Sequence, residues 1–385
     1  MEKTQELQID THHLFIDFKA AYDSIYREEL YRAMSSFGIP VKLIRLCRMT
    51  MENARCSIKV GKDLTDAFDV KKGFRQGDAL SCDFFNIVLE RIVQNSTVNT
   101  RGTIFQRSIQ LLGYADDIDI IGRSKRDVSG AFLSIATEAK KMGLVVNEGK
   151  TKYMLSSKKD IEQRRLLQNV TMDSYNFEVV KDFVYLGTAI NTDNDTSAEI
   201  KRRITLANRC FFGLRRQLRS KVLSRASKIT IYKTLIIPVL IYGAEAWTLS
   251  KKDENVLGCF ERKILRVIFG PVRIDGEWRR RFNDELYGLY SDTDLVSRIK
   301  VQRLRWLGHV ERMDINAPAR KVFESNPEGR RSRGRPRLRW RTQVGEDLNQ
   351  LGVRNWRQLA RDRDGLRRML VEAQVRPVSK YCKNL

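Results

Sequence analysis

The first half of the chain alternates between the two-residue period of β-strands and the 3.6-residue period of α-helices. A short apolar run over 13–18 predicts a strand, and the range 111–122 predicts two strands around a polar turn at Asp116 and Asp117. Helical patterns are predicted over three ranges: 24–37, 83–93 and 128–142. This order predicts an α+β fold in which helices cover one face of a sheet.

The second half is predicted to be mainly helical. A strand pair over 180–190, around Gly187, leads into a helical pattern from 198 to 269 that we expect to break at Pro238 and Gly243. Three segments follow: a weakly helical one over 296–312, a low-complexity one over 329–341, and an amphipathic one over 348–370.

The net charge of the chain indicates which class of molecule it binds. The chain has 71 Lys and Arg residues against 47 Asp and Glu residues, a formal net charge of +24, and a pI of about 9.9. Such a field attracts polyanions, of which nucleic acid is the usual one. The alternative is a basic protein without a dedicated partner. An apolar fraction of 42% is ordinary for a globular protein and argues against general disorder.

The six cysteines stand singly along the chain. This spacing argues against a zinc site and a disulfide framework, and it favours a reducing compartment. No N-terminal apolar stretch resembles a signal peptide, and no apolar run is long enough to span a bilayer. We therefore expect an intracellular protein without zinc.

The turn at Asp116 and Asp117 is the first candidate for chemistry. Paired carboxylates between apolar strands are costly to desolvate unless a cation neutralises them. Oxygen ligands suit Mg²⁺, which keeps several waters and is completed by substrate phosphates. Taken alone, an ordinary turn is the favoured interpretation, because turns commonly contain aspartate.

Two further segments carry polar residues at places that suit a ligand. Asp17 ends the first predicted strand, within the sequence FIDFKAAYDS. The loop GFRQGD, which starts at Gly73, has glycines that let the backbone approach a ligand closely, and it offers Arg75 and Gln76 as hydrogen-bonding side chains. The alternatives are a solvated strand end for Asp17 and a polar turn for the loop.

Taken in order, these segments resemble the palm of a reverse transcriptase. The resemblance covers motif A (FIDFKAAYDS), motif B (GFRQGDALS followed by FFNIVLE), motif C (YADD), motif D (GLVVNEGKT) and motif E (FVYLG). RQGD together with FIDFKAAYDS is similar to the branch found in non-LTR retrotransposons. The resemblance implies an antiparallel palm sheet with helices on one face, followed by a helical thumb and a basic C-terminal region.

The resemblance also implies roles for single residues. Asp17, Asp116 and Asp117 would hold two Mg²⁺ ions, with the backbone carbonyl of Phe18 facing a metal. Tyr22 stands where the family has the aromatic steric gate against a ribose 2′-hydroxyl. The substrate-binding residues of motif B would be Arg75, Gln76 and Gly77. Lys150 matches a lysine proposed to protonate the leaving group, with Lys152 or a plain surface lysine as alternatives. Ala79 and Cys82 stand where the family often has proline.

The predicted organisation has four parts. They are a palm with partial fingers over 1–157, a connection with motif E over 158–197, a helical thumb over 198–275, and an Arg- and Trp-rich region over 276–385. Basic residues of the thumb would contact duplex phosphates: Arg202, Arg203, Arg215 and Arg216. In the last part, the candidates are Arg335, Arg337, Arg339 and Trp340. The arginine-rich run is equally consistent with a nuclear localisation signal.

These expectations combine into one function and one alternative. The function is an RNA-directed DNA polymerase that extends a primer 3′-hydroxyl with dNTPs on an RNA template, and we expect it to be located in the nucleus. Motif A lies almost at the first residue, so we expect the fingers to be incomplete and autonomous polymerase activity to be weak or absent. The alternative is a catalytically idle nucleic-acid-binding protein that keeps the palm fold.

Overall fold

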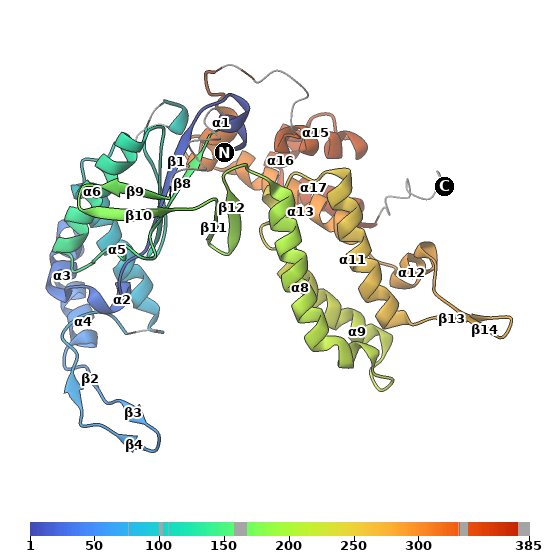
Figure 1. Cartoon of the computed structure of the whole chain (residues 1–385), viewed down its shortest axis with the longest axis horizontal. Helices are drawn as coiled ribbons and strands as arrows, with labels where there is room; N and C mark the ends of the chain where they lie inside the picture. Colours follow the sequence, from blue (N-terminus) through green and yellow to red (C-terminus); the bar gives the residue numbers. More distant parts are fainter. Residues whose placement is uncertain are drawn as a thin grey trace.

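The computed structural model describes residues 1–75, 77–99, 103–106, 108–157, 168–329, 331 and 338–375. Three apolar cores organise these residues: a palm core in the first half, a thumb core of helices, and a smaller C-terminal core. The sheet and its helices stand at one end of the molecule, and the thumb helices stand at the other (Figure 1).

A six-stranded sheet forms the palm. Its order is β6 (Gln110–Tyr114), β7 (Asp117–Gly122), β1 (Thr11–Ile16), β8 (Lys152–Ser156), β10 (Tyr175–Val179) and β9 (Asn169–Met172). Each neighbouring pair is antiparallel except β8 and β10, which are parallel. The predicted antiparallel sheet is therefore confirmed with one parallel pair. The sequence patterns did not predict β9 and β10.

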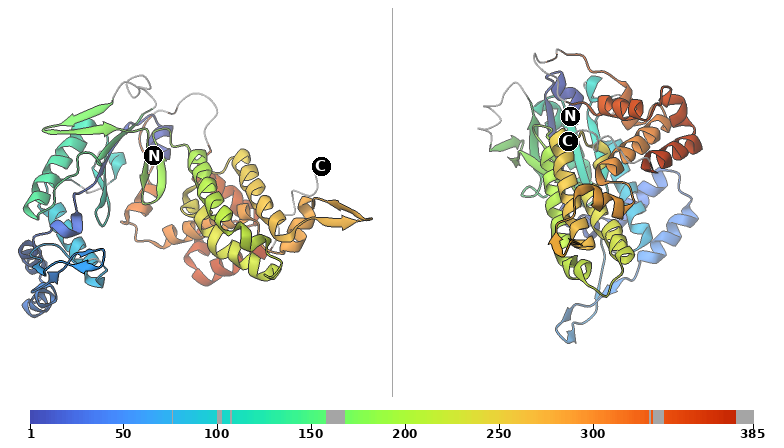
Figure 2. Two further views of the ribbon diagram at one scale, coloured as in Figure 1. Left: turned by 60° about the horizontal axis from the view of Figure 1, so that its bottom comes forward. Right: turned by 90° about the vertical axis from the view of Figure 1, so that its right-hand side faces the viewer.

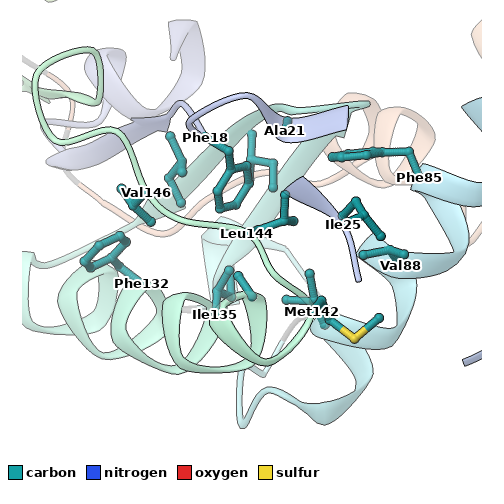
Figure 3. Close-up of a cluster of buried hydrophobic side chains, with 14 of the residues drawn as sticks. Phe18, Ala21, Ile25, Phe85, Val88, Phe132, Ile135, Met142, Leu144 and Val146 are labelled. Atoms are coloured by element: carbon teal, nitrogen blue, oxygen red, sulfur yellow. The ribbon is translucent and has the colours of Figure 1, made fainter. Parts of the chain in front are cut away.

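The side chains of the central strand β1 point alternately to the two faces of the sheet. Leu14 and Ile16 point into the apolar core, and they are almost completely buried. That face is covered by α6 (Lys125–Lys141), and α6 packs against α5 (Ala79–Asn95), which in turn contacts α3 (Arg27–Ser36). Figure 3 shows side chains of α5 and α6 meeting in this core. Helices on one face are confirmed.

The helix predicted over 24–37 is interrupted. α2 (Ala21–Ser24) ends where Ile25 becomes extended, and α3 begins at Arg27. The extended backbone is held from both sides, because Gly73 N–H donates to the Ile25 carbonyl at 2.9 Å and Tyr26 N–H donates to the Met142 carbonyl at 3.0 Å. Long-range backbone pairing overrides the local helical pattern at this point.

A projecting arm follows α4 (Val41–Met51). It consists of two short strand pairs, β2 (Arg55–Cys56) with β5 (Phe68–Asp69) and β3 (Lys59–Val60) with β4 (Asp63–Leu64). The arm extends away from the palm sheet (Figure 1). The arm lies within 1–157, the range that we predicted to hold the palm with partial fingers.

The thumb begins after the hairpin of β11 (Asp182–Tyr185) and β12 (Thr188–Asn191), which confirms the predicted strand pair. Its helices are α8 (Thr196–Arg219), α9 (Arg225–Ile231), α10 (Ile237–Ile241), α11 (Lys251–Phe269) and α12 (Asn283–Tyr290). The predicted break at Pro238 is wrong. A π-helical turn, η2 (Tyr232–Ile236), connects α9 to α10, and Pro238 lies in the first turn of α10, where a missing N–H is tolerated.

The break at Gly243 is confirmed, since Gly243 has a φ of +74° and a short 3-10 turn, η3 (Ala244–Ala246), follows it. The thumb core continues past residue 275. It includes Leu286 and Tyr290 of α12 and Ile299 of α13 (Leu295–Arg312). The apolar packing therefore links the predicted thumb to the beginning of the predicted C-terminal region.

The C-terminal core packs α13 against three helices: α15 (Trp340–Gln350), α16 (Trp356–Arg361) and α17 (Arg363–Val375). A shorter helix, α14 (Pro318–Glu324), lies beside α13. Arg303 of α13 is almost fully buried, donates to Gln343 Oε1 at 2.8 Å and pairs with Asp347. A buried charge needs such partners, so this group connects α13 to α15.

The first helix, α1 (Glu2–Glu6), joins the palm to the C-terminal helices. Gln5 Nε2 donates to Ser156 Oγ at 2.8 Å and to the Thr192 carbonyl at 2.7 Å on the palm side. On the other side, Lys3 Nζ donates to three carbonyls at the end of α14, those of Val322, Phe323 and Ser325, at 2.8, 2.9 and 2.6 Å. Among the described residues, no helix is both long enough and apolar enough to cross a membrane.

The thumb core contains an ionisable group. Glu261 of α11 is 1% exposed, and burial raises its pKa to about 7. Its carboxylate accepts hydrogen bonds from the hydroxyls of Tyr232 and Tyr287, both at 3.2 Å, and from Leu295 N–H at 3.1 Å. These donors favour the ionised form, but they do not fully offset the loss of solvent.

We predict that Glu261 makes the thumb less stable as pH rises. A carboxyl whose pKa is raised on folding costs no stability while it is protonated in both states, and it costs stability as pH increases from its ordinary value of 4.5 to about 7. Glu261→Gln should therefore flatten the fall in melting temperature between pH 5 and pH 8, measured by calorimetry. Glu346→Gln, at an exposed position of α15, is the control and should leave the curve unchanged. Equal slopes for wild type and Glu261→Gln would contradict the prediction.

Candidate active site

The ladder between β1 and β7 places two of the predicted aspartates opposite each other. Ile16 pairs with Ile118, and the residues just outside this pair are Asp17 and Asp117. The turn between β6 and β7 is tight, because Tyr114 pairs with Asp117 and only two residues lie between them. Ala115 there has a φ of +54°, a left-handed conformation. The strand pairing thus brings motif A and motif C together at the end of the sheet.

The carboxylates of motifs A and C repel one another electrostatically. Burial raises the pKa of Asp117, and the negative charges of Asp116 and Asp17 raise it further. One carboxylate oxygen of Asp17, Oδ2, is buried without a hydrogen-bond partner. Like charges held close together, with an acceptor left unsatisfied, are a favourable setting for a cation.

The aspartates do not form a closed ligand set in this conformation. Within the described ranges, no three His, Cys, Asp or Glu side chains are grouped so that they would hold a metal ion. The donor chemistry nevertheless fits Mg²⁺, because carboxylate oxygens are the ligands that this ion prefers. The unsatisfied oxygen of Asp17 and the raised pKa of Asp117 agree with that chemistry.

Motif D lies directly beside motif A. Asn147 N–H donates to the Asp17 carbonyl at 2.8 Å, and Asp17 N–H donates to Thr151 Oγ1 at 3.2 Å. Phe18 is buried and forms a β-bridge with Val146, and Figure 3 shows the two side chains close together. Thr151 is a positioning residue that we did not predict. Only the tertiary pairing of the two motifs reveals it.

The two lysines of motif D differ in their surroundings. Lys150 is exposed. Lys152 Nζ donates to the Gly149 carbonyl at 2.7 Å and pairs with Glu178 at 2.6 Å. Lys152 is therefore engaged in the sheet, and the geometry favours Lys150 of the two as a residue free to reach a substrate.

Tyr22 connects motif A to motif B. Its ring stacks on Phe85 with 4.8 Å between centroids and meets Phe74 edge-on at 6.4 Å, and its carbonyl accepts from Phe74 N–H at 2.9 Å. Burial, a hydrogen bond with Cys82 and the charge of Asp116 raise the pKa of Tyr22 to about 12. Tyr22, the residue predicted to be the steric gate, therefore lies close to motif C.

The motif B loop is anchored by its flanks. Arg75 is exposed, and its carbonyl accepts from Ser81 Oγ at 2.7 Å. Gly77 has a φ of +89°. Asp78 caps α5, with its carboxylate accepting from Leu80 N–H at 3.0 Å. Gln76 lies outside the described residues.

Motif E covers the face of the sheet opposite the helices. Phe183 of β11 stacks on Phe15 at 4.1 Å between centroids. Tyr185 donates its hydroxyl to the Leu112 carbonyl at 2.8 Å and lies 3.3 Å from the Asp117 carbonyl, and burial raises its pKa. Beneath this hairpin, His13 Nδ1 and Asp119 Oδ2 are 3.1 Å apart and both side chains are buried. The roles of Tyr185, His13 and Asp119 in supporting motif C were missed from sequence.

The predicted thumb arginines separate into two groups. Arg203 is buried, where its guanidinium binds Glu199 at 2.5 Å and the Gly187 carbonyl, and it stacks on Tyr242 at 4.6 Å. In this conformation Arg203 is not available to a duplex, because it attaches α8 to the motif E hairpin. Arg202 is half-buried beside the same carbonyl, at 3.1 Å. Arg215 and Arg216 are exposed farther along α8.

The C-terminal candidates are partly engaged within the chain. Arg339 pairs with Glu6 of α1, and Trp340 donates its indole N–H to the Glu245 carbonyl at 2.7 Å. The Trp340 ring also meets Phe323 edge-on at 6.1 Å. In this conformation Trp340 packs against the protein rather than offering an open face to a base. Arg335 and Arg337 lie outside the described residues.

Comparison with known proteins agrees with this geometry. Residues 1–190 match the family model described as "Reverse transcriptase (RNA-dependent DNA polymerase)". The matched residues belong to the reverse transcriptase family. It is similar to the Pol polyprotein of the retrotransposable element R2 of Popillia japonica, with 25% identity over 60% of this chain and 38% of that protein. The predicted membership of the non-LTR retrotransposon branch is confirmed.

Other relatives cover the chain to different extents. A transposon-derived protein of Caenorhabditis elegans is 24% identical over 67% of this chain and 93% of its own length. The RNA-directed DNA polymerase of the Drosophila melanogaster X-element is 22% identical over 84% of this chain, which spans 35% of that protein. Apo telomerase of Candida tropicalis has a TM-score of 0.38, with 16% identity over 81% of this chain and 47% of that one. The chain thus spans about two fifths or less of the R2 and X-element polyproteins.

We predict that Gly73 is required for the contact between motifs A and B. Its φ is +73°, and a Cβ there would lie 2.5 Å from Asp23 Cα. Gly73→Ala should therefore reduce the free energy of unfolding by about 2–4 kcal/mol, measured by urea titration. Gly130→Ala is the matched control, because Gly130 is exposed within α6 and a Cβ there meets nothing within 4 Å. A stability of Gly73→Ala equal to that of Gly130→Ala would refute the requirement.

Proposed function

We propose that this chain carries the polymerase active site of a non-LTR retrotransposon and extends a primer 3′-hydroxyl with dNTPs on an RNA template. The observation that supports this most directly is the placement of Asp17 opposite Asp117 at the end of the sheet, with a buried Asp17 oxygen that has no hydrogen-bond partner. The membership of residues 1–190 in the reverse transcriptase family provides the class of reaction.

In this proposal, Asp17, Asp116 and Asp117 hold two Mg²⁺ ions, together with the backbone carbonyl of Phe18. When bound, these ions would lower the pKa of the primer hydroxyl and neutralise the charge of the triphosphate. The protein's own residues contribute by fixing the position of Asp17. Thr151 and Asn147 fix the backbone of Asp17 from one side, and the β7 ladder fixes it from the other. A reacting group displaced by about 1 Å costs rate steeply.

The remaining residues of the site would select and orient the nucleotide. Tyr22, held between Phe85 and Phe74, presents a ring whose position is set by packing, as a steric gate against a 2′-hydroxyl requires. Arg75, Gln76 and Gly77 would contact the nucleotide or template, and exposed Lys150 would protonate the leaving group.

The positive net charge of the chain supports proposals about its binding partners and its location in the cell. The family binds an RNA template and a primer, and the net charge of +24 suits such polyanions. We extend this to duplex contacts by exposed Arg215 and Arg216 of α8, with half-buried Arg202 beside the motif E hairpin. A nuclear location would bring the protein to chromosomal target DNA. The arginine-rich run that includes Arg335 and Arg337 would serve as the nuclear signal or as an RNA-binding segment.

We predict Mg²⁺-dependent extension of an oligo(dT) primer on poly(rA) that requires Asp116. Asp116→Asn removes a metal-binding charge and should abolish labelled-primer extension, with a loss of about 100-fold or more. Asp173→Asn is the matched control. Asp173 is an exposed turn residue between β9 and β10, and β9 forms the sheet edge opposite β6. Extension by Asp116→Asn at the wild-type rate would exclude this site.

The same assay separates the alternative function and tests the expected weakness of the activity. Salt-sensitive binding of RNA without any primer extension would favour a catalytically idle nucleic-acid-binding protein. Robust synthesis that Asp116→Asn abolishes would contradict the expectation of weak autonomous activity.

We also predict that the carboxylate repulsion is measurable without any substrate. Because the pKa of Asp117 is raised on folding, its ionisation costs stability, and the cost grows as pH rises from the ordinary value of 3.8 through the raised pKa. In EDTA at pH 7, Asp117→Asn should melt at a higher temperature than wild type, whereas Asp173→Asn should not. Adding Mg²⁺ should raise the melting temperature of wild type and of Asp173→Asn more than that of Asp117→Asn. Equal Mg²⁺ shifts in all three proteins would rule out metal binding at Asp117.

A further inference from the structure

A hairpin at the far end of the thumb exposes aromatic side chains without packing them. Strands β13 (Val272–Ile274) and β14 (Glu277–Arg279) pair with each other, and within the described part of the chain they pair with no other strand. The hairpin projects from the thumb on the side away from the palm, as Figure 1 and the left view of Figure 2 both show. It therefore lies outside the space between palm and thumb, where the template-primer duplex is proposed to bind.

A tight turn, rather than an apolar core, stabilises this hairpin. Asp275 and Gly276 form its turn with φ values of +51° and +88°, the pattern of a tight two-residue hairpin turn. A two-stranded hairpin alone is only marginally stable. Yet Trp278 is 68% exposed and Phe282 is 64% exposed. Packing does not account for these side chains, because neither is buried against the thumb.

The exposed rings stand in a basic surface. Residues 262–282 contain seven basic side chains and two acidic ones. The acidic ones, Asp275 and Glu277, are both at the tip of the hairpin. Arg273 lies directly across from Trp278 in the ladder and therefore on the same face. The basic residues of this segment are Arg262, Lys263, Arg266, Arg273, Arg279, Arg280 and Arg281. Lys263 is directed toward α8, where its Nζ lies 4.9 Å from the centroid of the Phe212 ring.

Several of these arginines lie near each other. The pKa of Arg266 is lowered, first by burial and then by the positive charges of Arg280 and Arg262. Arg279 is different, because it pairs with Glu285 at 2.5 Å and its guanidinium stacks on Phe282 at 4.3 Å. Phosphate groups would relieve the repulsion between Arg262, Arg266 and Arg280.

We infer that this hairpin surface, Trp278 with the basic side chains of 262–282, binds a single-stranded segment of nucleic acid. Arginines would contact the phosphates, and the indole of Trp278 would stack on one base. An unpaired strand fits better than a duplex, because a stacked duplex offers no base face to an exposed ring. The inference goes beyond the proposed polymerase and is independent of it, since binding needs neither metal nor dNTP.

The test uses the full chain and fluorescence anisotropy with labelled oligo-uridine, oligo-deoxythymidine and a DNA duplex of the same length. Trp278→Ala should weaken binding of the single strands about 10-fold, as expected for loss of one base–aromatic stack, and should leave duplex binding unchanged. Trp278→Phe should keep affinity within about 3-fold, because it keeps a ring. Trp306→Ala, at a partly exposed tryptophan of α13, is the matched control and should bind like wild type.

A second measurement isolates the hairpin from the other basic surfaces. Intrinsic tryptophan fluorescence should be quenched by oligo-deoxythymidine in wild type, and this quenching should be largely lost in Trp278→Phe but retained in Trp306→Phe. A preference for oligo-uridine would assign the site to RNA, and a preference for oligo-deoxythymidine would assign it to displaced DNA. Equal single-strand affinity for wild type and Trp278→Ala would overturn the inference, and so would equal quenching for wild type and Trp278→Phe. A loss of duplex binding in Trp278→Ala as large as its loss of single-strand binding would overturn it as well.

Discussion

The alternation of side chains along β1 is the constraint on which the rest of the structure depends. One face of this central strand carries Leu14 and Ile16 into the palm core, and the other carries His13, Phe15 and then Asp17. A shift of one residue in the register would bury the wrong set of side chains, so the core fixes the pairing of β1 with β7 and β8. The position of Asp17 opposite Asp117 is therefore a consequence of apolar packing at the neighbouring residues.

The same packing explains how a cluster of carboxylates is maintained in a folded protein. The burial of Asp117 and its repulsion by Asp116 and Asp17 oppose folding at neutral pH, as the raised pKa of Asp117 indicates. The opposing contributions come from elsewhere: the palm core, the stacking of Phe183 on Phe15, and the backbone bonds of motif D to Asp17. Strained or repulsive groups persist at a site when their surroundings determine their positions more strongly than their own interactions do.

The excess of positive charge serves two different purposes in this fold. Buried arginines such as Arg203 and Arg303 connect elements distant in the sequence, because each is surrounded by carboxylates and carbonyls. Lys3 acts similarly between α1 and α14. Other arginines, on α8 and at the projecting hairpin, remain at the surface, where phosphates are their natural partners. Net charge predicts a polyanion as the partner but does not distinguish these two groups.

The sequence by itself determined the family, the order of the motifs and part of the secondary structure, because periodicity and the residues at strand ends are local signals. The predicted part comprises β1, β6, β7, β11, β12 and the helices α5 and α6, together with the mainly helical second half. Motif C and the strand pair of motif E were predictable in this way. Tertiary structure alone decided the rest. It split the helix over 24–37 at Ile25, joined β9 and β10 to the palm sheet, and turned Arg203 inward. It also placed Thr151 beside motif A, and Tyr185 and the His13–Asp119 pair against the strands of motif C. Each of these depends on contacts between residues far apart in the chain, which no local pattern records.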